Sequence, residues 1–255
     1  MSKTETLYGF HPVFEALRAG RRRFFEIYFA TEGASGRYAP IRARALQESI
    51  SVKQIPRDEL NKMAGSPFTQ GIAARVTPYP AAELSDALKK SKSAGDFPFL
   101  LLMDNILDPQ NLGALIRTGL CAGVHGVVIP KDRSTPPTPA VSKASSGALE
   151  HIFLVRVTNL TTTIESLKES GIWVFGMERH ATTTIFSQNL TGPVALVVGG
   201  EEKGIRPLVR RHCDGLFSIP QSGNFDSLNA SVAGGIAMFE VFRQRHPRPF
   251  PQKGR

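Results

Sequence analysis

The chain has 255 residues, of which 41% are hydrophobic and 21% charged, enough for one large domain or two small ones with their own cores. No apolar run approaches the roughly 18 residues of a membrane span, and the polar start MSKTETLYGF lacks the apolar core of a secretory signal, so we expect a cytoplasmic protein without a membrane partner. The net charge of +9 favours a polyanionic partner, although a solvated basic face gives the same balance. The two cysteines, Cys121 and Cys213, form neither a disulfide framework nor a metal cluster, so no metal is expected.

Residues 1–78 read as a small α/β module. Its first apolar pattern, over residues 7–20, predicts a turn followed by a helix that ends at Gly20. Alternating and helical patterns then predict strands over 24–30, 51–55 and 71–76, with helices over 40–50 and 57–65.

Four arginines, Arg18, Arg21, Arg22 and Arg23, stand near the end of the first predicted helix. Arginines at a helix C-terminus complement the helix dipole, which is a purely structural explanation. A cluster of this density also suits contacts with phosphates, so these residues are candidates for RNA binding.

A segment rich in proline, lysine and serine, residues 79–97, predicts a linker, of which 81–90 could form a short helix. Residues 98–245 then alternate between apolar runs typical of buried strands and helical patterns, and a basic tail, 246–255, follows. This alternation predicts a mostly parallel sheet with helices on both faces. The expected strands are 99–106, 126–130, 153–158, 172–178, 193–200 and 215–220; the expected helices are 109–123, 140–152, 160–171 and the end of 201–213.

Ligands of such sheets bind beyond the carboxyl ends of the strands, and polar side chains follow three of the predicted strands. They are Asn111 and Arg117, then Glu201, then Ser227 and Asn229. Each has a structural explanation when taken alone: a helix cap, a solvated helix arginine, or a carboxylate near a helix N-terminus. Their common position at strand ends of one sheet favours a shared site.

Three segments, NLGALIR (111–117), LVVGGEEKGI (196–205) and IPQSGNFDSLNASVA (219–233), occur in the order and spacing that mark one family. The chain resembles the SpoU family of RNA 2′-O-ribose methyltransferases, within the SPOUT superfamily, over about residues 98–245. The N-terminal module, which opens LYGFHPVFEAL, is similar to the ribosomal-protein-like substrate-binding domain of the ribosomal RNA branch.

The resemblance implies a C-terminal α/β domain with a trefoil knot, a homodimer, and S-adenosylmethionine as cofactor. It implies that Gly199, Ile219 and Leu228 hold the cofactor mainly through backbone groups, and that Asn111, Arg117, Glu201, Ser227 and Asn229 serve catalysis. Arginine hardly ever deprotonates in proteins, so a clamp on an RNA phosphate suits Arg117 better than the role of general base.

The expected reaction is methylation of a ribose 2′-hydroxyl in RNA. The expected substrate is a guanosine in the peptidyl-transferase region of 23S rRNA, because the N-terminal module resembles that of the ribosomal RNA branch. A guanosine of the tRNA D-loop is the alternative substrate, and a non-catalytic RNA-binding or ribosome-assembly protein is the alternative class. A nicotinamide-dependent dehydrogenase and a P-loop hydrolase are disfavoured because neither G-x-G-x-x-G after a strand nor G-x-x-x-x-G-K-[ST] occurs.

Overall fold

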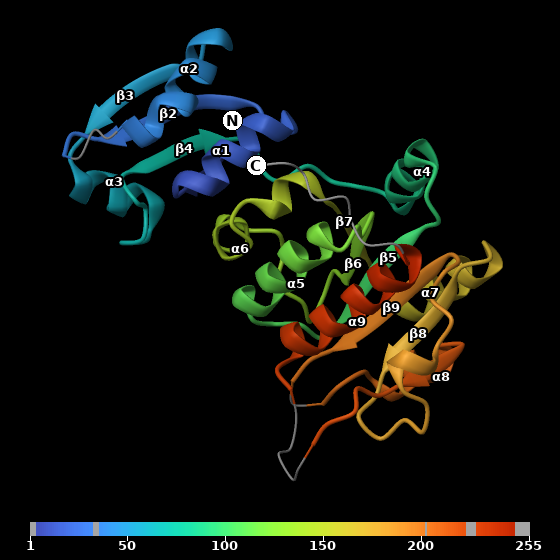
Figure 1. Cartoon of the computed structure of the whole chain (residues 1–255). Helices are drawn as coiled ribbons and strands as arrows, with labels where there is room; N and C mark the ends of the chain where they lie inside the picture. The colour runs from blue at the N-terminus through green and yellow to red at the C-terminus, as the bar shows by residue number, and fades with distance from the viewer. Residues whose placement is uncertain (1–3, 33–35, 202, 223–227, 248–255) are drawn as a thin grey trace. The chain divides into compact units, whose positions relative to one another are not determined.

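A computed structural model of the chain describes residues 4–32, 36–201, 203–222 and 228–247. Contacts divide it into two compact units (Figure 1). The first comprises Met1–Ala81, Leu112–Arg117 and Pro136–His151, and the second Ala82–Asn111, Thr118–Thr135 and Ile152–Arg255. The first unit therefore contains two short segments from later in the sequence, 112–117 and 136–151.

The N-terminal part of the first unit is a four-stranded sheet, in the order β1-β4-β2-β3, with helices. β1 pairs antiparallel with β4, and β2 pairs parallel with β3. The core includes Leu7, Val13, Leu17, Ile27 and Phe29, all fully or almost fully buried. The elements are β1 (Glu5–Tyr8), α1 (Phe10–Ala19), β2 (Phe24–Ala30), α2 (Ala39–Gln47), β3 (Ser51–Ile55), α3 (Arg57–Ala64) and β4 (Ile72–Val76), with a 3-10 turn at Gly36–Tyr38.

The predicted turn at the start of this part is wrong, because β1 lies there. Only four residues long, β1 buries Leu7 alone, so it lacks the alternation by which a strand is recognised in sequence. Gly9, with φ of +94°, separates β1 from α1, a backbone conformation that glycine adopts without strain.

The second unit is built on a six-stranded sheet in the order β10-β8-β9-β5-β6-β7. Every neighbouring pair is parallel, which confirms the predicted parallel α/β architecture. The strands are β5 (Phe99–Asp104), β6 (Gly126–Pro130), β7 (Phe153–Val157), β8 (Trp173–Met177), β9 (Val194–Gly199) and β10 (Gly215–Phe217).

Helices cover both faces of this sheet (Figure 1). Alternate strand residues such as Leu100, Leu102 and Val197 form one core cluster with Ala87 and Ile164 from helices α4 and α7. On the other face, α9 packs against β9, and its Met238 lies against Gly119 in the last turns of α5. The helices are α4 (Leu84–Ala94), α5 (Pro109–Cys121), α7 (Leu160–Glu169), α8 (Pro207–His212) and α9 (Ala230–Arg245), with a 3-10 turn at Ile185–Ser187.

The single helix predicted over 140–152 is wrong. The structure has instead a short helix, α6 (Pro139–Ala144), followed by a separate 3-10 helix (Ala148–His151). Between them Ser146 and Gly147 have φ of +52° and +83°. A left-handed pair of this kind terminates an α-helix, so the small residues of this segment form a tight turn. A Cβ atom at Gly147 would lie 2.7 Å from Glu15 Cβ, so α1 packs directly on the turn.

Candidate functional site

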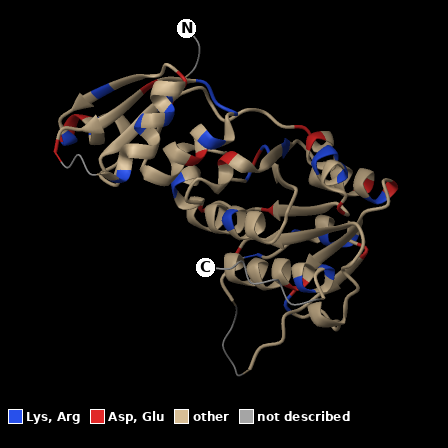
Figure 2. Ribbon diagram, turned by 45° about the horizontal axis from the view of Figure 1, so that its top comes forward, with Lys and Arg blue, Asp and Glu red and all other residues tan. Residues whose placement is uncertain are grey.

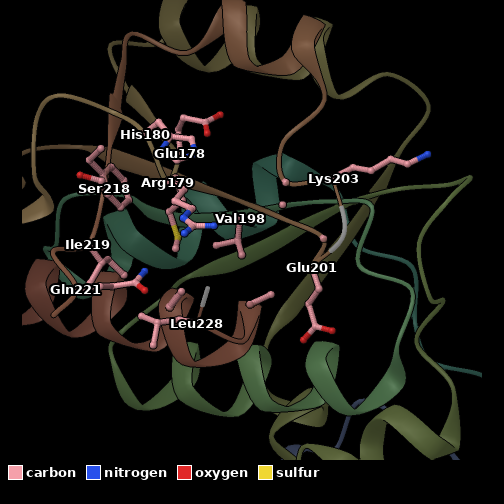
Figure 3. A pocket seen from close by; sticks show the side chains of 17 residues that line it. Glu178, Arg179, His180, Val198, Glu201, Lys203, Ser218, Ile219, Gln221 and Leu228 are labelled. Carbon is pink, nitrogen blue, oxygen red and sulfur yellow. The ribbon is translucent and has the colours of Figure 1, made fainter. Parts of the chain in front are cut away.

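A cavity of about 350 Å³ lies beyond the carboxyl ends of β8, β9 and β10, with the start of α9 as a further wall. This is the edge at which parallel α/β sheets bind ligands, and the volume is within the usual range for small-molecule sites. Figure 3 shows polar and apolar side chains facing the same space. The lining includes Glu178, Arg179 and His180 after β8, Gly199, Gly200, Glu201 and Lys203 after β9, Ile219 and Gln221 after β10, and Leu228 and Ala230 at α9.

The three residues expected to hold a cofactor, Gly199, Ile219 and Leu228, all line this cavity. Gly199 ends β9, where the chain folds back so sharply that a Cβ atom there would lie 2.1 Å from the carbonyl carbon of Gly204. Only glycine fits such a position, which explains why β9 ends in a glycine.

Three of the expected catalytic side chains, Asn111, Glu201 and Asn229, meet beside this cavity although 118 residues separate the first from the last. Asn111 Nδ2 donates a hydrogen bond to Glu201 Oε1 across 3.1 Å. Asn229 Nδ2 donates to Asn111 Oδ1 across 3.0 Å and also to Glu201 Oε1. The cluster joins the beginning of α5, the loop after β9 and the beginning of α9.

Helix capping accounts for only part of this cluster. The N-cap of α5 is Asp108, whose carboxylate accepts bonds from the backbone N–H groups of Gln110 and Asn111. The amide of Asn111 is therefore used for the contacts with Glu201 and Asn229. Asn229 does cap α9, since its Oδ1 accepts from the N–H groups of Ser231 and Val232, while its Nδ2 group makes the cross-cluster bonds.

Arg117 lies six residues after Asn111 on α5, but it belongs to the first unit. Its side chain is exposed, and Nη1 donates to Ser146 Oγ across 3.1 Å. The expected catalytic residue Ser227 lies outside the described residues.

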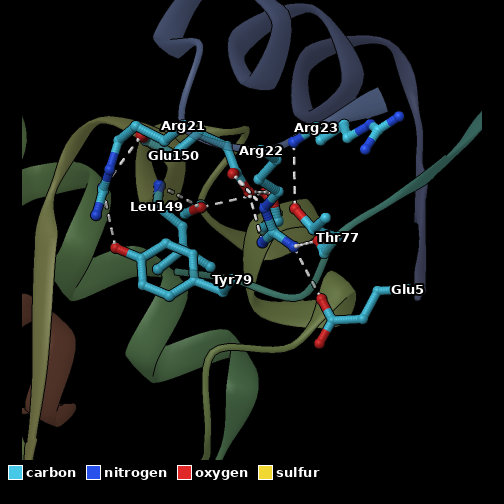
Figure 4. A network of polar contacts seen from close by, with 10 residues as sticks. Glu5, Arg21, Arg22, Arg23, Thr77, Tyr79, Leu149 and Glu150 are labelled. Atoms are coloured by element: carbon cyan, nitrogen blue, oxygen red, sulfur yellow. Dashed lines mark hydrogen bonds and ion pairs between the residues drawn. The ribbon is translucent and has the colours of Figure 1, made fainter. Parts of the chain in front are cut away.

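The four N-terminal arginines have different surroundings, and Figure 4 shows three of them, Arg21, Arg22 and Arg23. Arg18 and Arg23 are exposed. Arg21 is half-buried, lies 5.2 Å from the ring centre of Tyr79 and donates to its hydroxyl. The Arg22 side chain is fully buried and forms ion pairs with Glu150 at 2.7 Å and Glu5 at 2.8 Å. Burial and two carboxylate partners leave Arg22 no surface for an RNA phosphate, so the expected RNA contact does not include it.

Basic side chains are otherwise spread widely. Figure 2 shows Lys and Arg on helices, strands and loops of both units, with Asp and Glu between them. Among the described residues, Lys and Arg are therefore not confined to one unit.

Sequence reasoning missed Glu178, Arg179 and His180, which line the cavity after β8. Their position immediately after an apolar strand is the signal that identified the other site residues. Glu178 Oε2 accepts from Arg210 Nη1 across 3.2 Å, which holds this wall of the cavity against α8.

The cysteines are not part of the cavity lining. Burial, followed by the neighbouring Asp214 carboxylate, raises the pKa of the Cys213 thiol to about 12, so this thiol stays protonated at neutral pH. Among the described residues, no group of His, Cys, Asp and Glu side chains is arranged to hold a metal ion. Within the same residues, no helix has the length and apolar character to cross a bilayer.

The fold and the site define a two-part α/β protein with a small-molecule cavity at the carboxyl edge of a parallel sheet. The chain belongs to the SpoU rRNA Methylase family, whose model matches residues 98–239; a second model, RNA 2′-O ribose methyltransferase substrate binding, matches residues 6–82. The resemblance found in the sequence is thereby confirmed.

Several relatives match most of the chain. The 23S rRNA (guanosine-2′-O-)-methyltransferase RlmB of Vibrio vulnificus (strain CMCP6) is 43% identical over 94% of this chain and 97% of the relative. RlmB of Escherichia coli (strain K12) is 39% identical over 95% of this chain and 99% of the relative. The putative TrmH family tRNA/rRNA methyltransferase YacO of Bacillus subtilis (strain 168) is 40% identical over 94% of this chain and 95% of the relative.

Solved structures share the fold at lower identity. An RNA 2′-O ribose methyltransferase matches with a TM-score of 0.80 and 22% identity over 96% of this chain and 90% of its own. The SpoU methyltransferase AviRb from Streptomyces viridochromogenes, in complex with AdoMet, matches with a TM-score of 0.78 and 24% identity. The match covers 96% of this chain and 92% of AviRb.

Proposed function

We propose that this chain uses S-adenosylmethionine to methylate the ribose 2′-hydroxyl of a guanosine in 23S rRNA, in the peptidyl-transferase region. The observation that carries the proposal is the hydrogen-bonded cluster of Asn111, Glu201 and Asn229 beside the cavity. RlmB relatives named for guanosine 2′-O-methylation of 23S rRNA, at 39–43% identity, support the choice of substrate.

The residues of the cavity fit S-adenosylmethionine. Gly199 and Gly200 line the cavity, and Ile219 and Leu228 supply apolar walls. The charged side chains of Glu178 and Arg179 suit the polar groups of a nucleoside and an amino acid. When bound, the cofactor supplies a methyl group already activated on a positively charged sulfur.

The protein must then orient the ribose and assist loss of its proton, and positioning of this kind supplies much of the rate gain in group transfer. The amide groups of Asn111 and Asn229 both donate to Glu201 Oε1, and these two bonds give the carboxylate a defined orientation. Arg117, exposed and always charged, clamps an RNA phosphate. Ser227 completes the set of catalytic residues.

The rest of the proposal follows the family. Residues 1–78 bind the RNA, with Arg18, Arg21 and Arg23 as contacts, 79–97 link them to the methyltransferase domain 98–245, and 246–255 form a basic tail. The methyltransferase domain contains a trefoil knot, and the protein acts in the cytoplasm as a homodimer. Exposed Val232 and Phe239 on α9 support pairing of this helix with a second copy.

The test is methyl transfer from labelled S-adenosylmethionine to 23S rRNA and, separately, to tRNA, followed by mapping of the modified ribose. We expect one methylated guanosine in 23S rRNA and none in tRNA. A methylated tRNA D-loop guanosine would instead support the alternative substrate. Cofactor binding without any methylation of RNA would contradict the assignment as an enzyme.

A further inference from the structure

Asp104, the last residue of β5, has a side chain that is fully buried, yet it is not among the residues singled out for the site. Among the residues that the structure describes, its carboxylate is bonded to Arg206. Oδ2 accepts from the Arg206 backbone N–H across 2.8 Å, and Oδ1 accepts from Nε and from Nη2, each across 2.7 Å. Hydrogen bonds between a charged carboxylate and a charged guanidinium are among the stronger hydrogen bonds in proteins.

Asp104 also holds the chain at a second point. Its backbone carbonyl accepts a hydrogen bond from the N–H group of Gly200 across 3.0 Å. Gly200 directly follows β9, and Arg206 directly precedes α8. A single residue at the end of β5 is therefore bonded to both ends of the loop that connects β9 with α8.

This loop supplies one wall of the cavity. Gly200, Glu201, Lys203 and Gly204 all line it, and the loop is closed by the bond from the Gly204 N–H to the Gly200 carbonyl, across 2.9 Å. Glu201, one residue after Gly200, is also the carboxylate of the cluster with Asn111 and Asn229. The position of the loop thus determines both the cavity wall and the acceptor of the cluster.

We infer that Asp104 and Arg206 are positioning residues that preform the cofactor cavity, by fixing the loop between β9 and α8 before any ligand binds. The inference rests on the proposed function for the identity of the ligand. A loop held in place loses less conformational freedom on binding, so the pair increases cofactor affinity without touching the cofactor. The buried charge of Asp104 makes the arrangement sensitive, because a buried ion pair that loses one partner leaves an uncompensated charge or donor.

The first measurement compares Asp104→Asn with the unaltered protein by hydrogen–deuterium exchange, without cofactor. Asparagine has nearly the same size and keeps an acceptor for the Arg206 N–H, but its amide donors face the guanidinium. We expect faster exchange at the amides of Gly200, Gly204 and Arg206, with little change in β6 and β7. Unchanged exchange in this loop would overturn the inference.

The second measurement is calorimetric titration with S-adenosylmethionine. We expect the Kd of Asp104→Asn to rise about tenfold, while the KM for RNA stays within about twofold. Arg206→Met should raise the Kd similarly, and the double variant should be no worse than either single one, because the pair acts as a unit. A cofactor Kd that stays unchanged while the loop exchanges faster would also overturn the inference.

Glu150→Gln is the matched control. Glu150 is another almost fully buried carboxylate, paired through two oxygens with Arg22, but it belongs to the first unit and does not line the cavity. The Glu150→Gln variant should have a lower melting temperature and an unchanged cofactor Kd. If its Kd rose as much as that of Asp104→Asn, the rise in Kd would be explained by general destabilisation, and the inference would be overturned. If Asp104→Asn does not fold, Arg206→Lys, which keeps the charge, replaces it in both measurements. If the unaltered protein binds no S-adenosylmethionine, the proposed function fails, whereas the exchange data still decide whether Asp104 holds the loop.

Discussion

Arg117 Nη1 donates a hydrogen bond to the hydroxyl of Ser146, a residue held in the left-handed conformation by the turn between α6 and the following 3-10 helix. The turn contains Gly147, against which α1 packs, so Ser146 has little freedom to move. A long exposed side chain loses considerable entropy when it is held in place. The bond to Ser146 supplies part of that order before RNA binds.

Replacement of Arg117 by alanine should abolish methyl transfer and leave cofactor affinity unchanged. The reason is that Arg117 serves the RNA phosphate in the proposed mechanism, and the positive sulfur of the cofactor would repel a guanidinium. Single-turnover methylation and calorimetry with S-adenosylmethionine measure the two properties separately. A folded variant that no longer binds the cofactor would move Arg117 into the cofactor site.

Ser146→Ala should have a smaller effect than Arg117→Ala. It removes the hydrogen bond and keeps the guanidinium, so we expect a several-fold rise in the KM for RNA with cofactor affinity unchanged. Rates and KM values equal to those of the unaltered protein would mean that Ser146 does not prepare Arg117 for substrate.

Asn229→Ala should lower turnover about a hundredfold, because it removes an oriented contact from a site that works by positioning. It should also cost about 1 kcal/mol of stability, because the Asn229 side chain caps α9. Ser231→Ala should change turnover little, since the Ser231 hydroxyl contacts only the Oδ1 atom of Asn229 among the described residues.

Asn229→Ser separates the two roles of the amide. Serine is a good N-cap, so the variant should melt close to the unaltered protein while its turnover stays low, because the donor to Glu201 and Asn111 is gone. Single-turnover rates beside thermal melts test both expectations. A variant that keeps full turnover would reduce Asn229 to a helix cap.

The buried pair of Arg22 and Glu150 should be a stability determinant. Arg22→Met leaves a buried carboxylate without its partner, and we expect a loss of about 3–5 kcal/mol. The double variant Arg22→Met/Glu150→Gln should recover part of this loss, because Ser142 Oγ still has an acceptor at position 150. Scanning calorimetry suits the measurement because two units can unfold separately. A single variant that loses less than about 1 kcal/mol would contradict the expectation.

His125 should make stability depend on pH in the mildly acidic range. Burial lowers its pKa from the usual 6.5, and Nδ1 accepts a bond from the Phe99 N–H across 3.1 Å, which requires this nitrogen to be unprotonated. The unfolded chain therefore binds a proton more readily than the folded one, so stability falls as the pH falls through about 6.5 toward the lower folded value. His125→Asn keeps an acceptor without a titrating ring, and melts from pH 7.5 to 5 should show a smaller decrease. An equal decrease in both proteins would assign the effect elsewhere.

Buried strands were the part of the fold most readily predicted. Runs such as 99–104 are apolar at every position because helices cover both faces of the sheet, and this leaves a clear signal in the sequence. β1 was missed because a strand of four residues with one buried side chain has no such signal. The break after α6 was missed because it depends on backbone angles at Ser146 and Gly147, in a run of small residues that also suits a helix.

The meeting of Asn111, Glu201 and Asn229 could be predicted because the family motifs contain all three residues. Contacts without a motif were not. Asp104 and Arg206 are 102 residues apart, and nothing in either neighbourhood indicates the other. In the same way, Arg22 looked like a member of a phosphate-binding run because its partner, Glu150, lies 128 residues further along the chain.

The first unit combines segments that are distant in sequence, and this determines when its residues become available during synthesis on the ribosome. The residues of the apolar core within 4–76 are all present early in the nascent chain, but the second carboxylate that pairs with Arg22, that of Glu150, is added only when residue 150 has been made. Until then Arg22 has only Glu5 as a carboxylate partner, and the surface of α1 against which Gly147 packs has no cover from that turn. The first unit to begin folding is therefore completed only after α4, β5, α5 and β6 of the chain have been translated.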